Sequence, residues 1–298
     1  MSGILSHLGL GELLAIGSSL SYSVTMVCLR QGMRSSSPLA ATLFVNITVG
    51  TVGMVAALLR QTLQTSSPVP ILWFMAAGFV GAGLGKLLYC IGIERMGVSR
   101  STPIQSSTPI WGVLFAMATL GERPGAPVWL GTLCIVGGVS LLSLAEGEEG
   151  NGGGWFQHAL IFPLASSMLF ALPPVFMKFA FAHQRTPLVA VAVVFWAGMA
   201  ILLAGKPLLL GRGKIRADRR ALLWVALAGV FNFLTAIMYY TALAVGDVST
   251  VLPLSRLTPL WVVLISYLFL GRIERITERI VLAAALVVAG GVLITAFR

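Results

Sequence analysis

The sequence predicts an all-α integral membrane protein in which ten transmembrane helices form two inverted five-helix repeats. Its 298 residues are 57% hydrophobic and only 10% charged, whereas soluble domains carry about 25% charged residues. Its apolar runs reach the roughly 20 residues that a helix needs to cross a bilayer. Two stretches in different halves of the chain also have nearly the same sequence, which indicates an internal duplication.

The duplication is clearest around two Thr-Pro motifs. Thr108-Pro109-Ile110-Trp111 recurs as Thr258-Pro259-Leu260-Trp261, and each block ends in an apolar segment with a double glycine, Gly137-Gly138 or Gly290-Gly291. A repeat of this length means two copies of one structural unit. If each copy holds five spans, the copies face opposite ways across the membrane, which is a known ground plan of secondary transporters.

Ten apolar segments, most of them joined by short loops, define the expected spans. In order they cover residues 10–30, 38–60, 70–93, 98–120, 126–145, 157–182, 187–205, 220–243, 248–270 and 277–297. The first repeat is therefore expected over 1–145 and the second over 157–298. Residues 146–156 between them are rich in Gly and Glu, the composition of a flexible linker.

Equivalent residues extend the repeat to other spans. Ser18-Ser19 in span 1 matches Ser166-Ser167 in span 6, and Tyr22 and Phe170 occupy equivalent points of the same two spans. Aromatic side chains at such a point either gate a cavity or fill the core, and the sequence leaves both roles open.

Two basic residues lie deep inside predicted spans, Lys86 in span 3 and Arg256 in span 9. A basic residue at the centre of a transmembrane helix costs about 2.5–3.5 kcal/mol on insertion scales, so it normally faces the bundle interior or a wet cavity. No acidic residue is expected at comparable depth. Two interpretations stay open: the side chains snorkel or bond backbone carbonyls, or they line the substrate path and attract an anionic group.

Polar and aromatic residues on neighbouring spans extend this candidate substrate-binding cavity. Asn232, Thr235 and Tyr239 recur at helical spacing and share a face of span 8, and Ser106 matches Arg256 in the repeat. The alternative role for any one hydroxyl is a bond to its own helix backbone. The full candidate set is Lys86, Arg256, Tyr89, Gln105, Ser106, Asn232, Thr235, Tyr239, Ser255, Tyr22 and Phe170.

Other functional classes fit the sequence less well. The net charge of +10 comes from basic residues scattered over short loops, which is unlike a nucleic-acid-binding surface. The three cysteines lie in apolar spans without metal-ligand or redox spacing. A membrane enzyme would need a constellation such as a buried acid pair, which the sequence does not offer. We therefore expect no enzyme, no cofactor and no metal, and a single chain with both repeats can work as a monomer.

The motifs resemble those of the EamA-type branch of the drug/metabolite transporter superfamily. The resemblance rests on five spans per half, the two Thr-Pro-aliphatic-Trp stretches and Leu120-Gly121-Glu122 at the end of span 4, and it is clearest over 96–144 and 245–294. It implies a central cavity lined by spans 1, 3, 4, 6, 8 and 9, with spans 5 and 10 as supports. The second half departs from the pattern at a loop edge, where Arg272 stands in place of the glutamate and Glu274 follows two residues later.

The orientation in the membrane stays open. Most Lys and Arg residues lie in loops on the face opposite the termini, and the positive-inside rule then places both termini outside the cell. The family resemblance instead implies that both termini are cytoplasmic.

The sequence thus predicts a secondary-active transporter, expected to be an exporter, of small metabolites by alternating access. Lys86 and Arg256 favour amino acids or other carboxylate-bearing substrates. Lys86 is also the candidate carrier of a coupling proton, since burial favours the neutral form of a lysine. We expect the protein in a plasma membrane such as the bacterial inner membrane. The alternatives are an exporter of cationic or neutral drugs and a membrane scaffold without transport.

Overall fold

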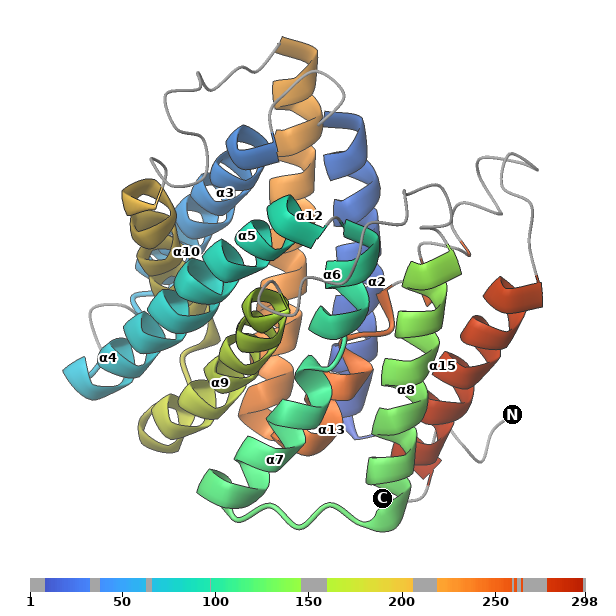
Figure 1. Ribbon diagram of the computed structural model, residues 1–298. Coiled ribbons are helices and arrows are strands. Elements are labelled where there is room, and N and C mark those ends of the chain that lie inside the picture. Colours follow the sequence, from blue (N-terminus) through green and yellow to red (C-terminus); the bar gives the residue numbers. More distant parts are fainter. Residues whose placement is uncertain are drawn as a thin grey trace.

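The regular structure of the protein is entirely helical over the residues that the computed structural model describes (Figure 1). These residues are 9–32, 38–62, 66–96, 98–145, 160–205, 219–258, 260–261, 264 and 278–296. The helices are α2 (Leu10–Gly32), α3 (Pro38–Leu59), α4 (Pro68–Ala77), η1 (Gly78–Gly85), α5 (Lys86–Met96), α6 (Val98–Gln105), α7 (Thr108–Leu120), α8 (Ala126–Ala145), α9 (Ile161–His183), α10 (Pro187–Ala204), α12 (Arg219–Val245), α13 (Val248–Leu254) and α15 (Glu278–Ala296). They correspond to the ten expected spans, although some helices reach up to three residues beyond the expected bounds and the ninth span is described only in its first part. This confirms the predicted fold class.

Six of the described segments have the length and the apolar composition to cross a membrane. They are Leu10–Leu29, Ala41–Leu59, Pro68–Ile93, Ile161–His183, Pro187–Ala204 and Ala221–Val245. Large apolar side chains such as Leu59, Leu72 and Leu223 are exposed on these helices. Exposed apolar surface of this kind suits contact with lipid rather than water. The predicted linker, 146–156, lies outside the described residues.

The two halves of the chain are interleaved. The most extensive helix contact joins α2 to α12, the next joins α8 to α15, and α3 packs on α10, so each pair takes one helix from each half (Figure 1). The pattern is also symmetric. Span 1 packs on span 8, and its counterpart span 6 (α9) packs in the same way on span 3 (α4, η1 and α5). Reciprocal contacts of this kind are what two related copies should make.

Glycines bring two of the paired helices into backbone contact. A Cβ atom added at Gly131 in α8 would lie 2.6 Å from the Gly290 carbonyl oxygen, and one added at Gly290 in α15 would lie 2.5 Å from the Gly131 carbonyl oxygen. Membrane helices associate closely where small residues leave room for the facing backbone. The crossing of α8 and α15 is therefore fixed by this glycine pair.

Spans 4 and 9 are interrupted, which the apolar pattern did not predict. In span 4, Ser106 and Ser107 form a turn between α6 and α7. In span 9, α13 ends at Leu254 and helical structure resumes at Thr258. Each new helix begins at the Thr of a Thr-Pro motif. Proline lacks the N–H that would continue the preceding helix but is well accepted in a first turn, so the repeated motif breaks both spans at equivalent points.

Candidate substrate-binding site

Lys86 opens α5, directly after the π-helix η1. Its Nζ lies 5.8 Å from the centroid of the Tyr89 ring, which is within the range of a cation–π attraction. The Tyr89 hydroxyl lies 3.1 Å from Oγ1 of Thr102 in α6. The structure thus brings the predicted residues Lys86 and Tyr89 together and links them to the first part of the broken fourth span.

Gln105 and Phe170 lie close to the same junction. The hydroxyl of Ser166, a buried residue of α9, donates to the Gly85 carbonyl at 2.8 Å and lies 2.9 Å from Oε1 of Gln105. A Cβ atom at Gly85 would be 3.4 Å from the Phe170 ring. We call Lys86, Tyr89, Thr102, Gln105, Ser166 and Phe170 the Lys86 cluster. It joins spans 3, 4 and 6.

The π-helix before Lys86 is packed tightly against the second half of the chain. A Cβ atom at Gly78 would lie 2.5 Å from the Val194 carbonyl oxygen of α10. Only glycine permits this approach between backbones. π-helical segments are rare and frequently lie at functional sites. This one determines the position of the Lys86 backbone, to which the basic side chain is attached.

Arg256 lies in the break of span 9. Its backbone N–H donates to the Pro253 carbonyl at 3.0 Å, as in a turn. Its Nε is buried and has no hydrogen-bond partner in the described part of the chain. Tyr239 of α12 lies beside the Ser255 side chain and within electrostatic reach of the Arg256 guanidinium, and the Ser255 hydroxyl donates to the Leu252 carbonyl at 2.7 Å. We call Tyr239, Ser255 and Arg256 the Arg256 cluster, and all three were predicted as site residues.

Serines of α2 and α9 hold the two broken spans in place. The Ser19 hydroxyl accepts the indole N–H of Trp261 at 2.8 Å, so span 1 anchors span 9. The Ser107 hydroxyl donates to the Ser167 hydroxyl at 3.1 Å, so span 6 anchors span 4. The Ser-Ser pairs marked the repeat in the sequence, but the sequence did not reveal that they anchor the breaks.

The remaining predicted residues make fewer contacts with the two clusters. The Ser106 hydroxyl donates to the Thr102 carbonyl and the Thr235 hydroxyl to the Phe231 carbonyl, both at 2.9 Å. These are bonds within a residue's own helix, the alternative role open to any membrane hydroxyl. Asn232 and Tyr22 are half-buried on α12 and α2, and the contacts described above do not join them to either cluster.

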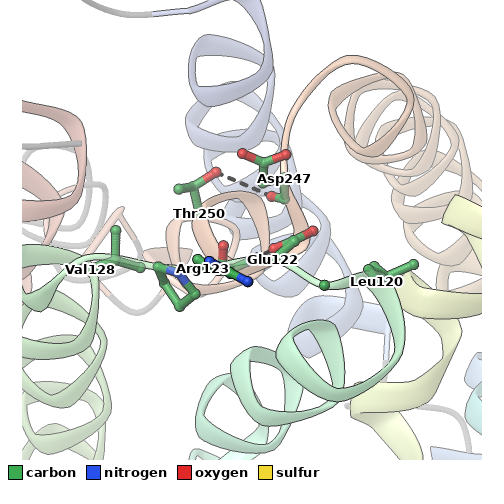
Figure 2. A pocket seen from close by; sticks show the side chains of 9 residues that line it. Leu120, Glu122, Arg123, Val128, Asp247 and Thr250 are labelled. Carbon is green, nitrogen blue, oxygen red and sulfur yellow. Dashed lines mark hydrogen bonds between the residues drawn. The ribbon is translucent and has the colours of Figure 1, made fainter.

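Two cavities lie elsewhere, at the end of the molecule where α7 ends and α13 begins. The first has a volume of about 310 Å³, and its lining includes Glu122, Arg123, Asp247 and Thr250 (Figure 2). The second, of about 330 Å³, shares Glu122 and Asp247 with the first and adds Lys178 and Arg185. None of the predicted site residues lines either cavity.

Glu122 is a residue with a specific contact that the sequence did not reveal. Its Oε1 accepts the Val248 N–H at 2.8 Å, and its Oε2 accepts the Ser249 N–H at 2.9 Å. Gly121, just before it, has a φ of 67°, a left-handed conformation that glycine readily adopts at helix ends. The Leu-Gly-Glu motif therefore ends α7 and directs a carboxylate to the start of α13. The motif itself was the only signal in the sequence.

Comparison with known proteins agrees with this architecture. The EamA-like transporter family matches residues 9–144 and 157–296. The uncharacterized transporter YdfC of Bacillus subtilis (strain 168) is 24% identical over 277 residues, which span 90% of this chain and 84% of that protein. The crystal structure of another protein superimposes on this chain with a TM-score of 0.81, covers 96% of both chains and is 18% identical in sequence. At this identity the similarity shows a shared fold alone.

The family matches cover both halves of the chain, as the interleaved repeats require. They confirm the expectation of a multi-pass membrane transporter rather than an enzyme. With its two matching halves, the chain belongs to the EamA-like transporter family of the drug/metabolite transporter superfamily.

Proposed function

We propose that this transporter exports small carboxylate-bearing metabolites, amino acids among them, by secondary-active alternating access. The observation that carries the proposal is the buried Arg256 Nε without a hydrogen-bond partner in the described part of the chain. A buried charged donor that is not satisfied costs free energy, which a paired anion recovers. A substrate carboxylate would supply that anion only when it is bound.

The positions of the two basic residues support the same proposal. Arg256 lies in a broken span and Lys86 follows a π-helix. Discontinuous membrane helices commonly form the substrate sites of inverted-repeat transporters. The planar guanidinium of arginine pairs with both oxygens of a carboxylate, whereas lysine supplies a compact point charge. Tyr89 adds a hydroxyl and an aromatic face to the Lys86 cluster, and Tyr239 adds the same two features to the Arg256 cluster.

The proposal extends to organisation and location. The first repeat covers 1–145, the linker 146–156 and the second repeat 157–298. A bacterial relative, YdfC, favours a plasma membrane such as the bacterial inner membrane. Because both repeats lie in one chain, a monomer is sufficient for transport. The lipid bilayer and the small-molecule substrate are the partners, and Lys86 is the candidate site for a coupling proton.

A thermal-shift screen of the purified protein tests the proposed substrate class. Amino acids, other carboxylates, sugar phosphates, organic cations and neutral compounds are compared on the wild type and on a Lys86→Ala/Arg256→Ala variant. A ligand present at 100 times its Kd stabilises the folded state by about 2.7 kcal/mol. We expect carboxylates to raise the melting temperature of the wild type and to have little effect on the variant.

The matched control is Arg60→Ala/Arg185→Ala, which removes two exposed positive charges away from both clusters. It should respond to carboxylates as the wild type does. If organic cations or neutral compounds alone stabilise the protein, and the Lys86/Arg256 variant responds like the wild type, the proposal is wrong and a drug exporter becomes the better account.

A further inference from the structure

The contact between Glu122 and α13 joins spans 4 and 9, which are equivalent spans of the two repeats. Both carboxylate oxygens are used, one on the Val248 N–H and one on the Ser249 N–H. Their distances, 2.8 and 2.9 Å, are those of charge-assisted hydrogen bonds, which are roughly twice as strong as neutral ones. One side chain therefore fastens the end of one broken span to the beginning of the other.

The N-cap side chain of α13, which usually accepts hydrogen bonds from the first turn of its helix, does not do so here. Asp247 is the N-cap residue and has extended backbone angles, but its side chain makes no capping hydrogen bond. An Asp at this position normally accepts an N–H from the first turn of its own helix. Here a residue from the other half of the chain, 126 and 127 positions away, accepts two of those N–H groups.

The surroundings of Glu122 place this contact at an opening of the molecule. Glu122 lines both cavities, so its carboxylate lies between two hollows at the same end of the bundle. In Figure 2, Glu122 and Arg123 lie beneath Asp247, the N-cap residue of α13, and Thr250 in its first turn. Thr250, which lines the first cavity beside the contact, is itself buried, with an exposed fraction of 3%.

Among the residues that the structure describes, this contact occurs in one repeat. The equivalent position of the second half holds Arg272, which lies outside the described residues, and an arginine side chain has no hydrogen-bond acceptor. Arg272 itself therefore lacks the acceptor that Glu122 uses, and the next carboxylate in the sequence is Glu274, two residues later. The two halves thus differ in sequence at this position.

We propose that Glu122 is the latch of a gate formed by spans 4 and 9, and that its two hydrogen bonds hold the transport path closed on this face of the membrane. The inference rests on the proposed alternating-access function, since the latch must break whenever this face opens. Loss of the carboxylate shifts the population of the protein toward the state open on this face.

Thiol accessibility measures the latch without any substrate. Cys28, Cys90 and Cys134 are replaced by serine or alanine, and Thr250→Cys introduces a single reporter thiol at a buried position beside the contact. A charged, membrane-impermeant maleimide then labels the thiol in detergent. We expect labelling to be about tenfold faster or more in Glu122→Ala, which corresponds to a shift of about 1.4 kcal/mol. Glu122→Gln, which keeps one acceptor oxygen, should give a smaller increase.

The matched control is Arg123→Ala, an exposed neighbour that lines the same cavity, and it should label at the wild-type rate. Equal labelling of wild type and both Glu122 variants overturns the latch, as does an equal increase in Arg123→Ala. If Glu122→Ala does not fold, the comparison with Glu122→Gln decides. The proposed function is judged separately: it fails when no carboxylate is bound or transported, whatever the labelling rates.

Discussion

The indole N–H of Trp261 donates to the Ser19 hydroxyl across 2.8 Å and joins the ninth span to the first. In the other half, the equivalent Ser167 hydroxyl is bonded by Ser107, and Trp111, the counterpart of Trp261, stacks on Phe115 of its own helix with ring centroids 6.5 Å apart. The repeats thus share positions but differ in chemistry. Equivalent substitutions in the two halves should therefore have unequal effects.

Trp261→Phe tests this difference directly. The substitution removes the N–H donor and leaves the Ser19 oxygen without that partner, so we expect a loss of about 1 kcal/mol in the free energy of unfolding. Trp111→Phe keeps an aromatic ring against Phe115 and should cost less. Thermal unfolding of both variants in the same detergent makes the comparison. Equal losses would show that the bond to Ser19 adds nothing to stability.

The glycine contact between α8 and α15 predicts a sharp difference between two neighbouring glycines. Gly131→Ala pushes a methyl group toward the Gly290 carbonyl oxygen, and such overpacking costs about 1–3 kcal/mol. In the same helix, a Cβ atom added at Gly137 meets no heavy atom within 4 Å, and alanine is the better helix former by about 1 kcal/mol. Gly131→Ala should therefore lower the melting temperature, and Gly137→Ala should leave it unchanged or raise it. A Gly131→Ala protein as stable as Gly137→Ala would contradict the backbone contact.

The role proposed for Arg256 predicts that its shape matters as well as its charge. Arg256→Lys keeps the positive charge but loses the planar pair of donors that fits a carboxylate. We expect carboxylate affinity to fall about tenfold, or by about 1.4 kcal/mol, with a larger loss in Arg256→Ala. Titration calorimetry on the ligand found by the thermal-shift screen gives both values. Affinities that match the wild type in both variants would remove Arg256 from the site.

Lys86→Arg tests the proposed coupling proton. Arginine keeps the positive charge but does not release its proton in proteins. If Lys86 carries the coupling proton, the variant should bind substrate yet lose the pH dependence of transport that the wild type shows. Uptake into proteoliposomes measured over a series of pH values compares the two. If transport by the variant and by the wild type depended on pH in the same way, another group would carry the coupling proton.

The helical content and the duplication could be predicted because their signals are local. An apolar run of sufficient length is a span wherever it lies, and the Thr-Pro-aliphatic-Trp repeat is visible without any structure. The breaks in spans 4 and 9 were within reach of the same reasoning, since each precedes a Thr-Pro motif. They were missed because the apolar pattern continues through them, and hydropathy does not register the N–H that a proline lacks.

The contacts of the candidate site could be predicted only in part, because they join distant parts of the chain. Residue type and depth were enough to single out Lys86 and Arg256. That Tyr239 would meet Ser255, and that Ser166 would meet Gln105, depends on how α12 and α9 pack. Glu122 was missed for the same reason, since its two N–H partners lie more than 120 residues away in the sequence.

Transport itself tests the proposed role of Lys86 and Arg256 most directly. The purified protein is reconstituted in proteoliposomes, and the vesicles are loaded with the carboxylate that binds best. Exchange of the labelled compound is then compared among the wild type, Lys86→Ala/Arg256→Ala and the Arg60→Ala/Arg185→Ala control. We expect the control to exchange substrate like the wild type. The exchange rate of the Lys86/Arg256 variant should fall at least about tenfold, which corresponds to about 1.4 kcal/mol in activation free energy. Wild-type exchange by the Lys86/Arg256 variant would contradict that role.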